Sequence, residues 1–267
     1  MSSVQLGPYR IDDVNIHGSG TPLSEAQADA LEDMIRRSLL GLKSFDPTGR
    51  EGLTARVWAR RGDDARHVEL LLRLEVPEAL RAGIRGGVVE AHVGWPADPA
   101  SDDAGAWEEA SARAAKAVEA QFRLASGGDG VVAELLAADD PHLNVVAMEW
   151  LRSEGDRVRL QLVINMLGHT EPQVARLAVE IIGELGGPEH ASALVRHVRL
   201  ADPGHAHRTY EALASLGGVD AEGFLRFAAR NEDDPQRQHT ARVALDRLMR
   251  STGASNQRAD ILRGHRP

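Results

Sequence analysis

The stretch PQVARLAVEIIGELG, residues 172–186, decides how the second half of this chain folds. It opens with a proline, carries aliphatic side chains at helical spacing and ends on a glycine, as a short buried helix does. The opening proline recurs. Pro141, Pro172, Pro203 and Pro235 follow one another at intervals of 31, 31 and 32 residues. A regular interval of this length predicts a repeat protein.

Each repeated proline has a physical role at the start of a helix. Its missing N–H costs nothing in the first helical turn, where that group has no partner. An acidic residue precedes each proline and favours the positive end of the helix. A small residue stands six positions later and an aliphatic one four positions beyond that. The two sets are Ala147, Ala178, Thr209 and Ala241, and Leu151, Ile182, Leu213 and Leu245.

Upstream of each proline lies a second apolar segment, so one unit is helix, turn, helix. One such unit cannot bury its apolar face alone, whereas stacked units can. The sequence therefore predicts a right-handed α-solenoid of about four helical hairpins over residues 127–250, followed by a flexible tail over 251–267.

This half resembles the HEAT-like repeat families, including the short bacterial type also found in phycobilisome bilin lyases. The resemblance rests on residues 172–186 and on the recurrence of Glu180 as Glu149 and Glu211. Val243 departs from the glutamate pattern and Arg208-Thr209 from the apolar pair, so the third and fourth units are degenerate. The resemblance implies a fold, and a binding or scaffold role, for the C-terminal half only.

The first half mixes strand and helix signals and predicts an α+β domain over residues 1–126. Ser24 and Gln27 form a capping-box pattern at the start of a helix. Two runs with alternating apolar residues predict an antiparallel hairpin. The expected order is a strand over 4–16, a helix over 24–42, the hairpin strands 53–59 and 68–76 with a turn at 61–64, a strand over 88–93 and a helix over 107–124.

We expect the two helices of this domain to pack on one face of the sheet. The segment Ser126–Gly130 is small and polar, so it is the expected junction between the two domains.

Composition limits the classes of function. Hydrophobic residues make up 42% and charged residues 27%, as in globular proteins. The net charge of −9 disfavours nucleic acid as a partner, because a phosphate backbone attracts a basic surface. The chain has no cysteine, which excludes disulfides, thiolate metal sites and cysteine nucleophiles.

The N-terminus lacks a signal-peptide pattern and no stretch reaches about 18 apolar residues. These patterns predict no membrane span and a cytoplasmic location, or a periplasmic one if an export signal was removed.

Three groups of residues are candidates for a site. Glu149, Glu180 and Glu211 recur at equal positions and predict either an acidic ridge for a basic partner or helix positions that pair with nearby arginines. Arg196 and Arg199, with Arg226 and Arg230, form either a basic stripe or part of a mixed solvated face. His197, His205 and His207 are either metal ligands or solvated turn residues. We expect no cofactor and no metal.

The favoured function is a non-catalytic protein–protein interaction or scaffold role, because the sequence shows no Ser-His-Asp arrangement, nucleophile elbow or HExxH helix. One alternative is a cell-envelope accessory protein whose first domain joins a larger assembly, since that domain faintly resembles one found in bacterial envelope lipoproteins. A second alternative is a lyase-like repeat enzyme with a cofactor pocket. The sequence leaves the identity of the protein partner and the oligomeric state open.

Overall fold

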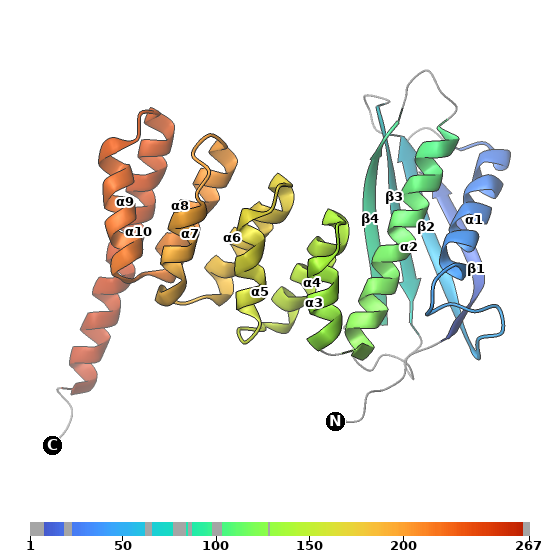
Figure 1. Cartoon of the computed structure of the whole chain (residues 1–267), viewed down its shortest axis with the longest axis horizontal. Coiled ribbons are helices and arrows are strands. Elements are labelled where there is room, and N and C mark those ends of the chain that lie inside the picture. Colours follow the sequence, from blue (N-terminus) through green and yellow to red (C-terminus); the bar gives the residue numbers. More distant parts are fainter. Residues whose placement is uncertain are drawn as a thin grey trace. The chain divides into compact units, whose positions relative to one another are not determined.

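The computed structural model describes residues 8–18, 23–61, 66–76, 84, 87–97, 103–127 and 129–263, with the side chains of Asp129 and of residues after 251 left out. The chain forms two compact units, Met1–Ala147 and Met148–Pro267 (Figure 1). Each unit is described by itself below.

The first unit is a four-stranded sheet with helices. Its elements are β1 (Tyr9–Gly18), α1 (Glu25–Leu40), β2 (Glu51–Arg61), β3 (His67–Glu75), β4 (Val88–Pro96), α2 (Ala104–Gly127), α3 (Asp129–Ala137) and the first part of α4 (Pro141–Glu154). The strands lie in the order β1-β2-β3-β4. The β1–β2 pair is parallel and is connected through α1, whereas β2–β3 and β3–β4 are antiparallel. The predicted α+β order and hairpin are confirmed. The predicted turn at 61–64 and residues 4–7 of the first strand fall mostly outside the described residues.

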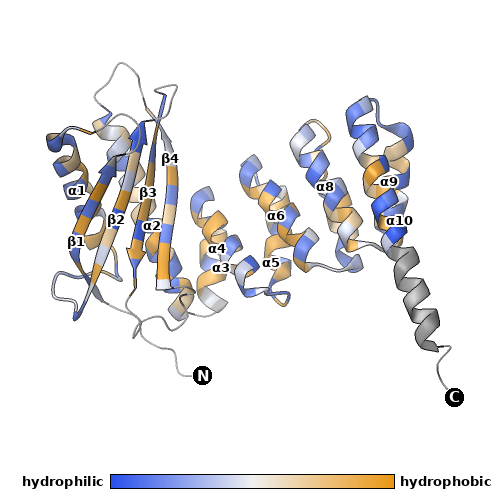
Figure 2. Ribbon diagram, turned by 180° about the vertical axis from the view of Figure 1, so that it is seen from behind, coloured by the Kyte–Doolittle hydropathy of each residue, from blue (hydrophilic) through white to orange (hydrophobic). Residues whose placement is uncertain are grey.

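The core of this unit lies between one face of the sheet and two helices. Alternate side chains of β2 and β3 are at most 1% exposed, namely Leu53, Ala55, Val57, Ala59, Val68, Leu70, Leu72 and Leu74. Helices α1 and α2 both cover this face, lying before the sheet in Figure 1 and behind it in Figure 2. The capping box at α1 is present as predicted: the Ser24 hydroxyl accepts the Gln27 N–H, and the Gln27 side chain accepts the Ser24 N–H at 2.9 Å.

The first helical pair, α3 and α4, begins within this unit. At the expected junction, α2 runs to Gly127 and α3 already starts at Asp129. Asn144 of α4 is fully buried, and its amide donates to the carbonyls of Leu135 at 2.8 Å and Ala138 at 3.1 Å, which closes the end of α3. Val146 of α4 packs against the core of the sheet and its two helices, so the start of α4 is packed with the α+β layer. The division into two functional domains at residue 126 stays a prediction.

The open face of the sheet is charged. Glu69 on β3 accepts hydrogen bonds from Arg60 at 2.6 Å and is 3.1 Å from the imidazole Nε2 of His67. The hydrogen bond from Arg60, supported by His67, lowers the pKa of Glu69 to about 2. Trp58 on β2 lies beside His17 on β1, with ring centroids 5.3 Å apart in a stacked arrangement.

The second unit is built of paired helices. After the end of α4 come α5 (Leu160–Asn165) with the 3₁₀ turn η3 (Met166–Gly168), α6 (Pro172–Leu185), η4 (Pro188–His190), α7 (Ala191–His197), α8 (Pro203–Leu216), α9 (Gly218–Asn231) and α10 (Pro235–Arg263). Each of the four repeated prolines is the first residue of a helix, as predicted. The pairs α5/α6, α7/α8 and α9/α10 follow one another in this unit. Helix α10 extends to Arg263, into the segment expected to be a flexible tail.

Caps and small residues fix the pairs as the repeat predicts. Asp202 accepts the His205 N–H at 3.0 Å at the start of α8, and Asp234 accepts the Arg237 N–H at 2.8 Å at the start of α10. Glu171, before α6, makes no such cap with its side chain. The small residues six positions after the prolines are fully buried: Ala147, Ala178, Thr209 and Ala241.

Candidate functional site

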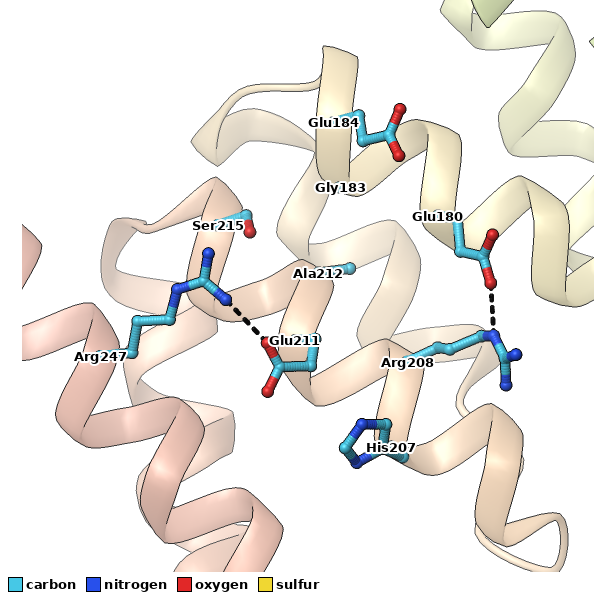
Figure 3. A pocket seen from close by; sticks show the side chains of 9 residues that line it. All are labelled: Glu180, Gly183, Glu184, His207, Arg208, Glu211, Ala212, Ser215 and Arg247. Carbon is cyan, nitrogen blue, oxygen red and sulfur yellow. Dashed lines mark hydrogen bonds and ion pairs between the residues drawn. The ribbon is translucent and has the colours of Figure 1, made fainter. Parts of the chain in front are cut away.

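An open cleft of about 460 Å³ lies along the second helices of the pairs, across α6, α8 and α10 (Figure 3). Its floor is made of Gly183, Ala212 and Ser215, and its walls carry charged side chains. All of these residues come from helices that open with a repeated proline. The cleft is therefore a direct product of the repeat, since the same side of successive second helices faces it.

The floor depends on a close approach between α6 and α8. A Cβ atom placed on Gly183 would lie 2.8 Å from the Ala212 Cβ and 2.9 Å from the Ala212 Cα. These distances are well inside the roughly 3.5–4.0 Å at which carbon atoms pack. Glycine at this position lets the two helices touch. Because the side chains at the contact are small, space is left above them for the cleft.

The walls carry ion pairs that connect successive second helices. Arg152 of α4 donates to Glu184 of α6, with 2.7 Å between its Nε and the carboxylate. Arg208 of α8 donates to Glu180 of α6. Arg247 of α10 donates to Glu211 of α8 at 2.8 Å (Figure 3 shows the last two). Successive second helices from α4 to α10 are thus joined by one cross-helix pair at each step.

These ion pairs are exposed to solvent, so their side chains can readily leave one partner for another. The side chains of Arg247 and Glu211 are 59% and 37% exposed, and those of Arg208 and Glu180 are 41% and 36% exposed. Exposed pairs of this kind contribute on the order of 0–1 kcal/mol to stability. Their charged groups can therefore turn towards a ligand at little cost to the fold.

The structure places the predicted glutamates along this side of the molecule. Glu180 and Glu211 line the cleft, and each accepts a hydrogen bond from an arginine of the next second helix. Glu149 stands at the matching place on α4, 3.5 Å from Arg152. Each carboxylate thus has a nearby guanidinium, and a continuous acidic ridge stays a prediction.

The predicted arginines lie elsewhere, on the side of the first helices. Arg196 is exposed near the end of α7. Arg199, just after α7, is half-buried and donates to the backbone carbonyls of His169 and Leu167. Its guanidinium connects the turn of its own pair to that of the preceding pair. Arg226 on α9 is paired with Glu222, and Arg230 is exposed.

The three histidines considered as metal ligands are divided between different environments. His205 is 1% exposed, and its Nδ1 accepts the Arg199 N–H at 3.3 Å. His207 is exposed and lines the cleft. The Nδ1 of His197 is 2.9 Å from the Ala193 carbonyl. Within the described ranges, no three His, Asp or Glu side chains are grouped as a metal site requires.

Sequence reasoning missed most of the cleft. Gly183, Glu184 and Arg247 were not singled out, and Arg208 was noted only as a departure from the repeat. A partial signal exists: oppositely charged residues stand on successive second helices, at offsets from their prolines that differ from one pair to the next. Arg208 and Glu180, for example, lie five and eight residues after theirs.

Two smaller hollows lie outside this cleft. One, of about 300 Å³, lies between the first turns of α8 and α10 and is lined by Tyr210 and Arg237. Both side chains donate to Glu232, and burial followed by this hydrogen bond raises the pKa of Tyr210. The other, of about 80 Å³, is an apolar gap between α1 and α2 beside Met34 and Trp107.

Comparison with known families matches residues 160–246 to the family described as HEAT repeats. The match spans helices α5 to α9 and the first part of α10, and it includes every residue that lines the cleft except Arg247. The resemblance drawn from residues 172–186 is therefore confirmed. No curated protein and no solved structure matches the chain. Among the described helices, none has the length and apolar character needed to cross a membrane.

Proposed function

We propose that this protein is a non-catalytic interaction module that holds a segment of a protein partner in the cleft across α6, α8 and α10. The observation that carries the proposal is the cleft itself, which joins a small-residue floor to walls of exposed, paired charges. HEAT repeats at residues 160–246 support it, because stacked helical pairs present extended binding surfaces.

The charges of the cleft favour a protein over a nucleic acid. Three carboxylates, those of Glu180, Glu184 and Glu211, face two guanidinium groups, those of Arg208 and Arg247. A phosphate backbone is attracted by an excess of positive charge. A polypeptide carries both signs of charge as well as backbone donors and acceptors, so it can satisfy both walls at once.

The same arrangement favours binding over catalysis. Its ionisable side chains are held two by two along the length of three helices rather than converging on one point. A catalytic site instead brings a nucleophile or base and its partners within reach of a single reacting atom. We therefore infer a surface that recognises a partner and leaves it chemically unchanged.

A site-specific photo-crosslinker distinguishes the two sides of the helical pairs. The probe is placed at Ser215, which is exposed on the cleft floor, and the matched control at Arg196, which is exposed on α7. We expect the Ser215 probe to capture a defined protein in the lysate of the native cell and the Arg196 probe to give none. Capture from Arg196 alone would overturn the assignment to the cleft.

Charge exchange tests the role of the walls. Glu211→Arg and Arg247→Glu each leave two like charges facing across α8 and α10, and each should weaken capture. The double exchange restores the ion pair in reverse order, so it should keep the fold while presenting the wrong charges to the partner. Equal capture by the wild type and the double exchange would mean that this wall does not contact the partner.

A further inference from the structure

The third helical pair carries a histidine where the two pairs before it carry aliphatic side chains. The residue two positions after the opening proline is Leu143 in α4, Val174 in α6 and His205 in α8. Val174 is fully buried and His205 is 1% exposed. An apolar side chain therefore suits this place, and an imidazole there must lose its water without a packing advantage.

The imidazole closes the turn between α7 and α8. Its Nδ1 accepts the backbone N–H of Arg199 at 3.3 Å and lies 3.4 Å from the Thr209 hydroxyl. Because Nδ1 is an acceptor, the proton of the neutral ring is on Nε2. That Nε2 is buried and has no hydrogen-bond partner among the described residues. The ring thus holds the turn only in its neutral form.

The residue held by this ring also joins two helical pairs. The side chain of Arg199 donates to the carbonyls of His169 and Leu167, which lie between η3 and α6 in the preceding pair. His205 fixes the backbone of Arg199, and Arg199 holds the turn before α6. One of the connections between the second and third pairs therefore depends on the lone pair of the His205 Nδ1.

The charges around His205 oppose a second proton. Arg176 faces it from α6, Arg199 from the turn after α7, and Arg208 from its own helix. Asp202 is the opposing carboxylate, but its Oδ1 already accepts the His205 N–H and its Oδ2 lies 3.8 Å from Arg176. The ring also lies in the first turn of α8, where the helix dipole disfavours a cation.

We propose that His205 is a pH-sensitive switch at the joint between the second and third helical pairs. A proton taken from water onto Nδ1 occupies the lone pair that accepts the Arg199 N–H, so that hydrogen bond is lost and the turn after α7 opens. The effect reaches the cleft because Arg208, one turn further along α8, forms the pair with Glu180 of α6. This proposal does not depend on which partner the cleft binds.

The direction of the pH effect follows from the environment. Burial first, and then Arg199, lowers the pKa of His205 below its ordinary value of 6.5. At a pH between the lowered pKa and the ordinary value of 6.5, His205 binds a proton when the joint is open and stays neutral when the joint is closed. The closed joint is therefore fully stable above about pH 6.5 and weakens as the pH falls, by up to about tenfold per pH unit, until the lowered pKa is passed.

Hydrogen exchange of the full chain at pH 7.5, 6.5 and 5.5, corrected for the intrinsic exchange rate, measures this directly. We expect the protection of the Arg199 amide to fall several-fold between pH 6.5 and 5.5. His205→Val, which copies the residue of α6, should remove this fall, and His207→Ala on the same helix should keep it. Constant protection of Arg199 in the wild type, or an equal fall in His205→Val, would overturn the switch.

A measurement on the wild type covers the case in which His205→Val does not fold. The imidazoles of His205 and His207 are titrated by NMR in the full chain. We expect His205 to take up its proton at a pH below its ordinary 6.5, and the amide signal of Arg199 to move with it. An Arg199 amide that follows the His207 signal instead, or a His205 that titrates at or above pH 6.5, contradicts the proposal.

Discussion

One added methyl group at Gly183 tests whether the cleft floor is fixed by contact between α6 and α8. The new Cβ would lie 2.8 Å from the Cβ and 2.9 Å from the Cα of Ala212. Because the second of these atoms belongs to the backbone, a rotamer change cannot relieve the contact. The two helices must separate by roughly 1 Å to reach an ordinary carbon–carbon distance.

The expected magnitude combines two opposing effects. Replacing glycine by alanine inside a helix gains about 1 kcal/mol of stability from backbone entropy. Overpacking a close contact costs about 1–3 kcal/mol. Gly183→Ala should therefore range from neutral to about 2 kcal/mol destabilising. Gly223 of α9 is a matched control, since a Cβ there meets nothing within 4 Å and the same exchange should stabilise by about 1 kcal/mol.

Urea unfolding followed by circular dichroism at 222 nm compares the two variants with the wild type. The double variant Gly183→Ala, Ala212→Gly removes the closer of the two contacts. The free energy of unfolding of the double variant should be at least about 1 kcal/mol higher than the value obtained by adding the two single changes to the wild type. If Gly183→Ala stabilises the chain as much as Gly223→Ala, α6 and α8 do not touch at the floor and the account of the cleft is wrong.

Three further predictions concern stability. Asp234→Ala removes the cap of α10 and should cost about 1 kcal/mol, whereas Glu171→Ala removes no cap and should cost less; thermal unfolding ranks the two. Glu69 has a pKa lowered to about 2 from an ordinary 4.5, so the stability it contributes is present above about pH 4.5 and is lost as the pH falls towards 2. Glu69→Gln should flatten that part of the pH–stability profile, and an unchanged slope would contradict the assignment. Deleting residues 1–126 should lower the melting temperature of the remaining repeats and promote aggregation, because the start of α4 packs with the α+β layer; a cooperative and unchanged melting transition of 127–267 would argue against this.

The repeat register was predictable to the residue because two independent constraints coincide at each proline. The ring fixes the backbone angle that a first helical turn needs, and the missing N–H costs nothing there. Helices α4, α6, α8 and α10 accordingly start at Pro141, Pro172, Pro203 and Pro235. The strands were predictable for a similar reason, since alternating burial along β2 and β3 leaves a period of two in the sequence.

The cleft was not predictable because a repeat pattern places residues along one helix and does not say what faces them on the next. Arg208, five residues after its proline, reaches back to Glu180, eight residues after the preceding one. Arg247 stands twelve residues after its proline and reaches Glu211. Because the offsets differ from one pair to the next, no single spacing in the sequence identifies the partner on the following helix.

The segment that composition marks as the junction between the two domains is helical. Ser126–Gly130 has the composition of a linker, yet α2 and α3 occupy nearly all of it. The start of α4 is joined to α3 by one buried amide, that of Asn144, which satisfies the carbonyls at the end of α3. A polar residue inside an apolar helix pattern signals an exposed position as readily as a buried cap.

The apolar pattern of the repeat weakens in α10, and the exposure of its side chains accounts for the change. Seven residues after the proline, Val179 of α6 and Tyr210 of α8 are at most 1% exposed, whereas Arg242 of α10 is exposed. Eleven residues after it, Gly183 of α6 touches α8, whereas Asp246 of α10 is exposed. The positions that are buried or in close contact in α6 and α8 are thus exposed in α10. The apolar pattern of the fourth unit is lost where its side chains are exposed, because an exposed position needs no apolar side chain.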